Sequence, residues 1–371
     1  MNEALERIAA DVVAPHALQV DQRGEFPRHS IDALAQAGFL GLLSATEVGG
    51  QGKGAREAAL VVERLARDCS STAMVLCMHY AGVAVLEQHG LESVREAVAA
   101  GKHLSTLAFS EAGSRSQFWA PVGSAERAAD GGIVLNGRKS FVTSATNATA
   151  YVWSSRPLAA PGASTIWLVP ARSEGLSMPA KFDGLGLRGN DSAPVTAEGV
   201  RVAETDRLGA DGAGLQIMLE VALPLFNIMS AAQSIGLMQA ATAKTAQHAS
   251  GSRFTHSQSA IADLPTVRAY LARMRVKTDM VHALLLDTLA ALESGRQDAV
   301  LRVLECKAAA GETATEVLDL AMRVCGGAAF RKELGVERLF RDARASTVMA
   351  PTTDALYDFI GKAMCGMELF G

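Results

Sequence analysis

The spacing of apolar residues changes twice along this chain of 371 residues. Up to about residue 105 apolar side chains recur with a period near 3.6, which predicts helices at Asn2–Val13, Pro27–Ala37, Gly54–Cys69, Ser71–His89 and Leu91–Ala100. Residues 106 to 212 have shorter apolar runs between Gly, Pro and Asn turns, which predicts strands at Ile133–Leu135, Ser140–Val142, Ala150–Ser154, Thr165–Val169 and Val195–Val202.

The helical period returns after residue 212 and predicts long helices at Leu215–Ala249, Leu264–Glu293, Ala299–Cys325 and Thr352–Met364. A chain of this length exceeds what one hydrophobic core usually serves. The pattern therefore predicts an α+β protein with a helical domain over residues 1–105, a β domain over 106–212 and a second helical domain over 213–371.

The segment Leu107–Thr143 contains the most informative chemistry. It opens with Ala108-Phe109-Ser110-Glu111-Ala112-Gly113-Ser114 and closes with Leu135-Asn136-Gly137-Arg138-Lys139-Ser140-Phe141-Val142-Thr143. Asn136-Gly137 is typical of a two-residue type I′ turn, so the pattern predicts a β-hairpin there. Because strand side chains alternate, Lys139, Phe141 and Thr143 are expected on one face. A cation, an aromatic ring and a hydroxyl in a row suit a flat, polar ring system.

These two segments resemble the paired flavin-binding motifs of the acyl-CoA dehydrogenase family, A-L-T-E-P-x-A-G-S-D and N-G-x-K-x-W-I-T-N. The resemblance places Phe109, Ser110, Gly113 and Ser114 at the flavin, with Ser110 at its pyrimidine edge and Ser114 near its phosphates. It places Phe141 against the ring system and Thr143 near flavin N5. The first loop is two residues short and lacks the proline, Arg115 stands where the family has aspartate, and Phe141 replaces tryptophan.

Similar stretches extend over nearly the whole chain. Cys325-Gly326-Gly327-Ala328 resembles the family's Gly-Gly turn, which reaches the cofactor of a neighbouring subunit. Arg253 is the nearest counterpart of an arginine that does the same, and Thr352 belongs to the cofactor-binding set by its place in the terminal motif. The backbone N–H groups of Gly326 and Gly327 can approach a ligand closely because glycine has no side chain.

The resemblance implies an N-terminal helical domain, a central β-barrel-like domain and a C-terminal four-helix bundle. It also implies FAD, a homo-oligomer (tetramer or dimer), and oxidation of an acyl thioester, on CoA or an acyl carrier protein, to the α,β-unsaturated product. Electron-transfer flavoprotein is the implied electron acceptor.

The catalytic base is missing from both places where the family has it. Most members have glutamate in an E-G-T motif after R-D-A-R, and Arg341-Asp342-Ala343-Arg344 puts Ala350 there. A minority have it ten residues before a G-L-M-Q-A, which gives Phe226. Asp354 and Glu220 are the nearest other carboxylates, and Asp354 shares a face with position 350 if a helix opens at Pro351. A first-turn carboxylate also favours the helix dipole, which is the structural alternative for Asp354.

Two other functions stay open at this point. Relatives of the family use reduced flavin to activate oxygen as monooxygenases and need no glutamate at these positions. The chain could also be a non-catalytic subunit of a hetero-oligomeric dehydrogenase.

Composition also limits the classes of partner and the compartment that are expected. A net charge of −4 gives no reason to expect nucleic acid or an anionic membrane. The five cysteines are scattered without C-x-x-C spacing, and the N-terminus does not resemble a signal peptide, so a cytoplasmic protein with reduced thiols is expected.

Two local patterns are weak guides to function. Gly184-Leu185-Gly186-Leu187-Arg188-Gly189 has G-x-G-x-x-G spacing, but Asn190–Pro194 after it cannot open the helix that a dinucleotide site needs. A lone histidine on an apolar helix, His79, is expected to be a packing residue.

Overall fold

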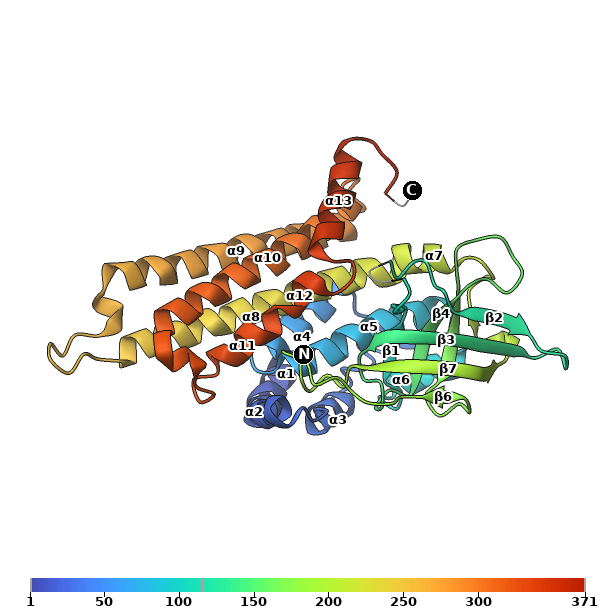
Figure 1. The fold of residues 1–371 in the computed structure, drawn as a ribbon, viewed down its shortest axis with the longest axis horizontal. Coiled ribbons are helices and arrows are strands. Elements are labelled where there is room, and N and C mark those ends of the chain that lie inside the picture. The colour runs from blue at the N-terminus through green and yellow to red at the C-terminus, as the bar shows by residue number, and fades with distance from the viewer. Residues whose placement is uncertain (1, 115–116, 370–371) are drawn as a thin grey trace. The chain divides into compact units, whose positions relative to one another are not determined.

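The protein is described by a computed structural model that covers residues 2–114 and 117–369. Its elements are helical up to Ala99, mostly strands from Ser105 to Leu208, and helical again from Gly214 (Figure 1). The predicted α+β class and the α–β–α order are therefore confirmed. The chain forms two compact units: unit 1 comprises Met1–Val61, Ser71–Gly184 and Arg188–Phe226, and unit 2 comprises Val62–Ser70, Leu185–Leu187 and Asn227–Gly371.

The first hundred residues form helices joined by short turns. Asn2–Val13 was predicted to be one helix, and the helix in fact continues through a π-helical segment, Ala9–Val13, to Gly24, where a positive φ ends it. The helices are α1 (Asn2–Ile8), α2 (Ala14–Arg23), α3 (Arg28–Gln36), α4 (Ala55–Ala66), α5 (Ser70–His89) and α6 (Glu92–Ala99).

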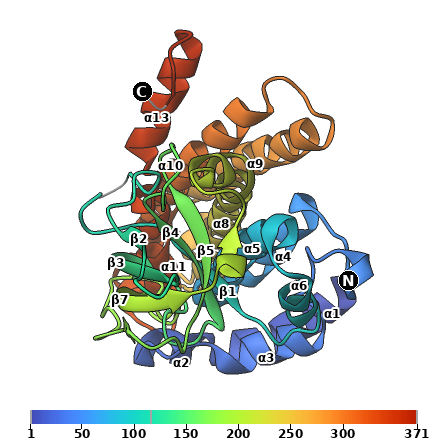
Figure 2. The same ribbon diagram turned by 90° about the vertical axis from the view of Figure 1, so that its right-hand side faces the viewer.

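The strands of unit 1 form two four-stranded sheets with the orders β1-β4-β5-β8 and β2-β3-β7-β6 (Figure 2). One apolar core, which includes Leu135, Trp153, Trp167 and Val195, is drawn from both sheets. The strands are β1 (Ser105–Ala108), β2 (Ser124–Arg127), β3 (Ile133–Val142), β4 (Ala150–Ser155), β5 (Thr165–Pro170), β6 (Leu176–Ser177), β7 (Ala193–Val202) and β8 (Arg207–Leu208).

The predicted hairpin at Asn136-Gly137 is wrong, because residues 133–142 form one continuous strand, β3. Ile133–Leu135 already pairs with β2 on one edge and with β7 on the other, so neither edge is left for residues 138–142. Neither Asn136 nor Gly137 has the positive φ that a type I′ turn requires. Asn136 instead accepts a hydrogen bond from Gly199 N, 2.8 Å away.

The predicted row of Lys139, Phe141 and Thr143 on one face is also wrong. The pairing of β3 with β7 is irregular between Lys139 and Val142, which shifts the alternation by one residue. Lys139 and Val142 are buried, whereas 66% of Phe141 is exposed. Phe141 therefore points away from the core into which Lys139 points.

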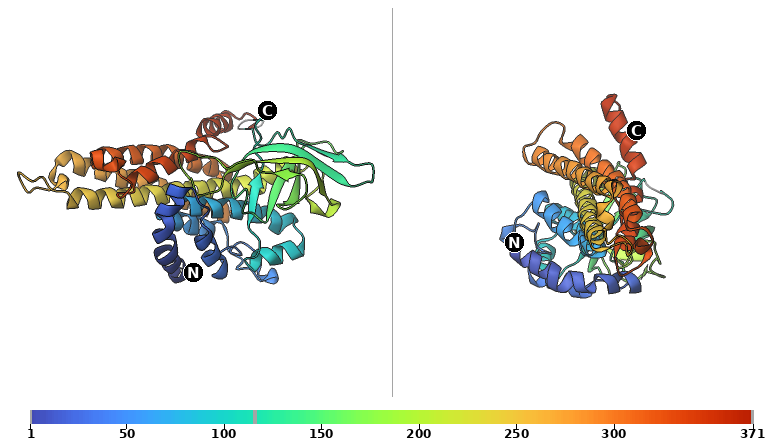
Figure 3. Two further views of the ribbon diagram at one scale, coloured as in Figure 1. Left: turned by 60° about the horizontal axis from the view of Figure 1, so that its bottom comes forward. Right: turned by 90° about the vertical axis from the view of Figure 1, so that its left-hand side faces the viewer.

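Unit 2 is helical. The long helices α8 (Leu223–Gly251), α9 (Pro265–Glu293) and α10 (Ala299–Cys325) run alongside one another, with α11 (Val336–Ala343) beside them (Figure 3). The shorter α7 (Gly214–Ile217), α12 (Ala345–Val348) and α13 (Thr353–Met364) complete the described helices of this half of the chain. The long helices at these positions are as predicted.

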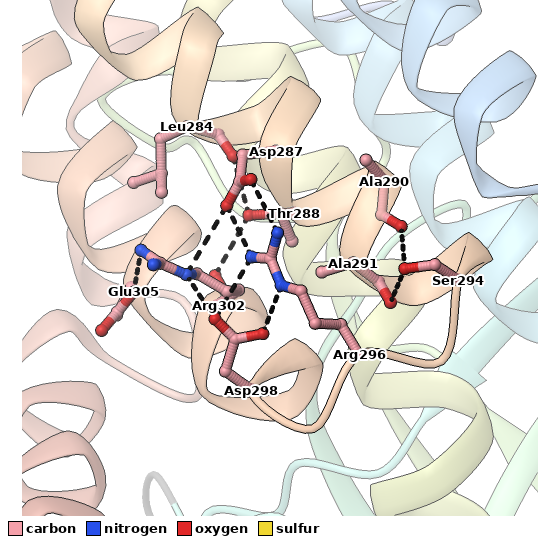
Figure 4. Close-up of polar contacts among 10 residues, drawn as sticks. All are labelled: Leu284, Asp287, Thr288, Ala290, Ala291, Ser294, Arg296, Asp298, Arg302 and Glu305. Carbon is pink, nitrogen blue, oxygen red and sulfur yellow. Dashed lines mark hydrogen bonds and ion pairs between the residues drawn. The ribbon is translucent and has the colours of Figure 1, made fainter.

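A network of charges closes the turn between α9 and α10 (Figure 4). Arg296 binds Asp287 through two hydrogen bonds of 2.9 and 2.7 Å and also contacts Asp298 at 2.5 Å. Arg302 reaches the same Asp298 at 3.0 Å. The side chains are about 40% exposed, so the network fixes the turn geometry and is screened by water.

The helical stretch Gly214–Gly251 is long and apolar enough to cross a membrane by length and composition alone. In the described residues 56% of that stretch's most apolar window is buried within the protein, as is typical of a core helix. All five cysteines are free, and four of them are buried.

Candidate active site

The ends of β1 and β3 lie side by side and bring three of the predicted flavin-contacting residues together. Ser140 N, on β3, donates a hydrogen bond of 2.9 Å to the carbonyl of Ser110, just after β1. Thr106 Oγ1, on β1, donates one of 2.8 Å to the carbonyl of Thr143. Ser110, Phe141 and Thr143 therefore occupy one region of unit 1.

A buried ion pair fixes the loop that carries Ser110. Glu111 Oε1 lies 2.6 Å from Lys139 Nζ, and both side chains are nearly inaccessible to water. Glu111 Oε2 accepts hydrogen bonds from the backbone N–H groups of Val122 and Gly123, at 2.7 and 3.0 Å. One carboxylate thereby ties the loop after β1 to β3 and to the chain entering β2.

The ammonium of Lys139 is fully engaged. It donates to the carbonyl and the hydroxyl of Ser154, at 2.7 and 2.9 Å, and lies 4.8 Å from the centre of the Trp153 ring. Burial lowers the pKa of Lys139 to about 8, although Glu111 acts in the opposite direction. The ion pair has a structural role, since each of the three N–H groups of the ammonium has an acceptor.

The turn after β3 is held by a loop that comes from far along the chain. Ser144, directly after Thr143, has a φ of 56°, and its N–H donates to the carbonyl of Asn190. Asp191 Oδ2 accepts hydrogen bonds from Thr146 N and Asn147 Nδ2, both at 2.8 Å. Asp191 was not predicted as a site residue, because nothing local in the sequence pairs it with a turn some 45 residues earlier.

The surface at this turn fits a flat polar ring. Phe141 is 66% exposed and packs against Phe182 with ring centres 4.6 Å apart. Among the described residues, neither the Ser110 hydroxyl nor the Thr143 hydroxyl has a side-chain hydrogen bond to the protein, so both are available to a ligand. The region thus offers an exposed aromatic face and two hydroxyls to a flat ring with polar edges.

The other predicted residues of this loop differ in exposure. Phe109 is buried, and its carbonyl accepts a hydrogen bond of 3.5 Å from Ser154 Oγ. Gly113 is exposed and Ser114 is half-buried, in the turn after Glu111. Arg115 lies outside the described residues.

In unit 2 there is free space beside the Gly326–Gly327 turn. Gly326 ends α10 with a φ of 54°, and a Cβ added to Gly326 or Gly327 would meet no atom within 4 Å. Arg253 lies in the turn between α8 and α9, where its Nη1 donates to the carbonyl of Gln258. Ala249, Val267 and Val324 form one small core, so this turn and the end of α10 lie at the same end of unit 2.

The segment at the expected base position is held by α10. Lys307 Nζ donates hydrogen bonds to the carbonyls of Met349 and Pro351, at 3.1 and 2.6 Å, on both sides of Ala350. Lys307 precedes Gly326 by 19 residues of helix, or roughly 28 Å. Within one chain, the Ala350 segment and the Gly-Gly turn therefore lie far apart.

Helix α13 begins at Thr353, so the premise that it opens at Pro351 is wrong. Thr352 is the N-cap, whose hydroxyl accepts a hydrogen bond from Ala355 N. Ala350 lies outside the helix, and helical spacing does not place Asp354 on its face. Asp354 is exposed, and no hydrogen bond or ion pair engages its carboxylate among the described residues.

Neither Phe226 nor Glu220, the other two positions considered for the catalytic base, offers a carboxylate without a partner. Phe226 is buried near the start of α8. Glu220 is exposed and accepts hydrogen bonds from Gln216 Nε2 at 3.2 and 3.1 Å. The residues described contain no group of three or more His, Cys, Asp or Glu side chains placed to hold a metal ion.

The G-x-G-x-x-G spacing at residues 184–189 and the lone histidine, His79, have the structural roles that were predicted. Residues 184–189 lie in irregular backbone, and a strand, β7, follows them instead of a helix. His79 is fully buried, with one ring nitrogen 2.9 Å from the Leu40 carbonyl and the other 3.0 Å from Ser105 N.

Curated relatives match over almost the full length. The chain is 28% identical to cyclohex-1-ene-1-carbonyl-CoA dehydrogenase of Geobacter metallireducens, over 96% of this chain and 95% of the relative. It is 28% identical to the human mitochondrial short-chain specific acyl-CoA dehydrogenase, over 92% and 83%. The structure of butyryl-CoA dehydrogenase from Megasphaera elsdenii superposes with a TM-score of 0.90 at 21% identity, over 98% of this chain and 96% of that one.

Three family models match consecutive parts of the chain. They describe the acyl-CoA dehydrogenase N-terminal domain at residues 1–101, the middle domain at 106–214 and the C-terminal domain at 212–365. The middle-domain match contains the Ser110, Phe141 and Thr143 region, and the C-terminal match contains the Gly-Gly turn. With all three domains matched in order, the chain belongs to the acyl-CoA dehydrogenase family.

Proposed function

We propose that this protein oxidises an acyl thioester between Cα and Cβ, using the region around Ser110, Phe141 and Thr143 to hold FAD. Members of the family are FAD-dependent oxidoreductases that act on CH–CH groups, and that coarse activity holds for this chain. The observation that carries the residue assignment is the pair of hydrogen bonds that join the end of β1 to the end of β3, from Thr106 to Thr143 and from Ser140 to Ser110. They bring two hydroxyls without a protein partner beside an exposed aromatic ring. Neither the monooxygenase nor the non-catalytic alternative is favoured by the relatives.

Each residue of the region has a role that follows from its surroundings. FAD supplies the acceptor for the hydride that leaves Cβ. Phe141 offers an open aromatic face for the ring system, and Ser110 and Thr143 offer hydroxyls to its polar edge. The Glu111–Lys139 pair and Asp191 keep these groups in place, so little reorganisation is needed when charge develops.

Asp354 is the proposed base for the α-proton. It lies three residues after Pro351, whose carbonyl Lys307 holds, and its carboxylate is free to accept a proton. Removal of the α-proton by a positioned carboxylate commonly contributes ~10² to 10⁴ in rate. With Ala350 and Phe226 in the usual positions, the first turn of α13 is where the chain offers a carboxylate.

The arrangement of unit 2 supports a homo-oligomer, with a tetramer proposed. The open Gly326–Gly327 turn lies roughly 28 Å along α10 from Lys307, which holds the Ala350 segment, and Arg253 lies at the same end of unit 2 as the turn. Val276 and Met280 on α9 form a short apolar stripe, one helical turn apart and each more than half exposed. Such an apolar stripe is typical of a surface that a second copy covers.

Electron-transfer flavoprotein is the proposed acceptor of the electrons, and the cytoplasm the proposed compartment. The free thiols fit a reducing compartment, since disulfides form in oxidising ones.

The function is tested by a steady-state assay on FAD-loaded protein with an acyl-CoA and an artificial one-electron acceptor. The expected product is the α,β-unsaturated thioester, identified by a mass loss of about two units from two removed hydrogens. Hydroxylated product formed from reduced flavin and oxygen would instead favour the monooxygenase.

A further inference from the structure

The exposed aromatic rings of unit 1 form a pair. Among the described Phe, Tyr and Trp residues of this unit, Phe141 and Phe182 are the exposed ones, at 66% and 40%, and the others are buried or half-buried. Phe141 lies on β3, and Phe182 lies in the loop between β6 and β7. Exposed apolar side chains that gather in one place, unlike scattered ones, commonly mark a binding surface.

The contact between the two rings is close. Their centres lie 4.6 Å apart and their planes are tilted by 31°, within the range of distances at which aromatic pairs attract. An exposed phenylalanine without such a neighbour can turn among its staggered rotamers. Phe182 therefore restricts the orientations that are open to the ring of Phe141.

Hydrogen bonds on both sides of Phe182 fasten its loop to α2. Lys181 Nζ donates to the carbonyl of Gly24 at 2.5 Å, and Arg188 Nε donates to the carbonyl of Asp21 at 2.9 Å. Asp21 lies in the last turn of α2, and Gly24 follows its end. The position of Phe182 is thus set by contacts within unit 1 and needs no ligand.

The same loop also holds the turn that follows Phe141. Phe182 N donates a hydrogen bond of 3.0 Å to the carbonyl of Ser192. The residue before Ser192 is Asp191, whose carboxylate accepts the hydrogen bond from Thr146 N. One segment therefore fixes Phe182 and the end of β3 relative to each other.

The ring at position 141 is smaller than the tryptophan of the family motif. A smaller ring has less area with which to contact its surroundings and a flat ligand. A side chain that is already fixed loses less freedom when a ligand binds, so the ligand binds more tightly. The ring of Phe182 supplies such support to Phe141.

We propose that Phe182 is a positioning residue for FAD, which acts by holding the ring of Phe141 in the orientation that receives the flavin. This inference rests on the proposed function, because it takes Phe141 as the ring that faces the cofactor. It adds to the site a residue that lies outside both flavin-binding motifs.

The test measures FAD affinity, which does not depend on turnover. FAD is removed from the purified protein and titrated back by calorimetry, and the visible circular dichroism of the bound flavin is recorded at saturation. Phe182→Ala is expected to weaken FAD binding by about threefold to tenfold, as loss of one aromatic contact gives, and to change the dichroism. Leu60→Ala removes a side chain of similar exposure, 43%, from α4 and should leave both unchanged.

Two further comparisons separate an effect through Phe141 from a general loss of stability. When Phe182→Ala is added to Phe141→Ala, FAD binding should weaken little further, because the ring that Phe182 holds is already absent. When Phe141→Trp is added to Phe182→Ala, most of the affinity should return, since the larger ring has more contact area of its own.

Wild-type affinity in Phe182→Ala, or losses that add in full in the double alanine variant, would overturn the proposal. Tighter binding in Phe182→Ala would also overturn it, because Phe182 would then occupy the place of the flavin. Wild-type affinity in Phe141→Ala would contradict the proposed FAD site and this inference with it. Bleaching of the flavin by acyl thioesters is recorded separately, so a failure of the proposed oxidation is distinguished from a failure of Phe182 to position FAD.

Discussion

Thr106 Oγ1 donates a 2.8 Å hydrogen bond to the carbonyl oxygen of Thr143, so β1 sets where the turn after β3 begins. This bond uses the backbone of Thr143 and leaves its side-chain hydroxyl unpaired in the described structure. The position of Thr143 and the chemistry of its hydroxyl can therefore be changed independently.

Thr143→Val is expected to slow flavin reduction by about tenfold or more, the equivalent of ~1.4 kcal/mol in the barrier. In the proposed site this hydroxyl bonds the flavin edge where charge changes during hydride transfer, and such bonds raise turnover. Stability should change little, because no protein partner is lost. Stopped-flow reduction and thermal unfolding measure the two effects.

Thr106→Val serves as the comparison. It should lower the free energy of unfolding by about 1 kcal/mol through loss of its bond to the Thr143 carbonyl. Wild-type reduction rates in Thr143→Val would place this hydroxyl away from the ring.

Lys139→Met is expected to lower the free energy of unfolding by about 3–5 kcal/mol, because it leaves the Glu111 carboxylate buried without its cation. Adding Glu111→Gln to this variant should restore part of the loss, since no buried charge then remains. Chemical denaturation of the three proteins checks the order. Near-wild-type stability of the single variant would mean that Glu111 is not buried with Lys139.

Stability is expected to fall as the pH drops from about 6.5 to about 4. Burial lowers the pKa of His79 and of His103 to about 4 from 6.5, so between these values the unfolded chain binds more protons than the folded one. The stabilisation is complete above pH 6.5 and decreases by up to about 1.4 kcal/mol per pH unit for each histidine.

The carboxylate of Asp211 affects stability only at lower pH than the histidines do. Burial opposes ionisation of Asp211, but hydrogen bonds from Thr165 and three backbone N–H groups lower its pKa to about 2, so its contribution is lost only below about pH 3.8. Thermal unfolding between pH 4 and 7 therefore reports on the histidines. His103→Gln should make the slope clearly shallower, and an unchanged slope would contradict this assignment.

Asp354→Asn is expected to retain FAD and thioester binding while losing ~10² or more of the rate of flavin reduction, because the variant lacks the proposed base for the α-proton. Asp358→Asn is the matched control, since Asp358 lies one turn further along α13 and is ion-paired with Lys362. A normal reduction rate in Asp354→Asn, with a stability loss of only ~0.3–1 kcal/mol, would make Asp354 a helix-start carboxylate.

The sequence predicted the elements well where the apolar period is long. The helices at Leu215–Ala249, Leu264–Glu293 and Ala299–Cys325 are found within a few residues of their predicted ends, because burial on one face imposes the 3.6 period on the sequence. Asn136-Gly137 misled the prediction because turn chemistry is local, whereas strand pairing is not: β2 and β7 bind both edges of Ile133–Leu135.

The candidate site was predicted in part. Ser110, Phe141 and Thr143 were identified by motif, and the structure brings them together. The residues that hold them could not be found in this way, since Asp191 bonds a turn 45 residues away and Lys139 is anchored by Ser154. Nor could the sequence show that Lys139 and Phe141 point in opposite directions. The alternation of side chains shifts between Lys139 and Val142, and this shift is seen only in the pairing of β3 with β7.

The central claim, oxidation of an acyl thioester by the bound flavin, is tested most directly by anaerobic titration of the FAD-loaded protein. Branched and straight-chain acyl-CoAs are added while the flavin absorbance is followed. We predict bleaching by at least one of them, with one enoyl thioester formed for each flavin reduced. Persistent yellow colour at saturating concentrations of every thioester that binds would contradict the account.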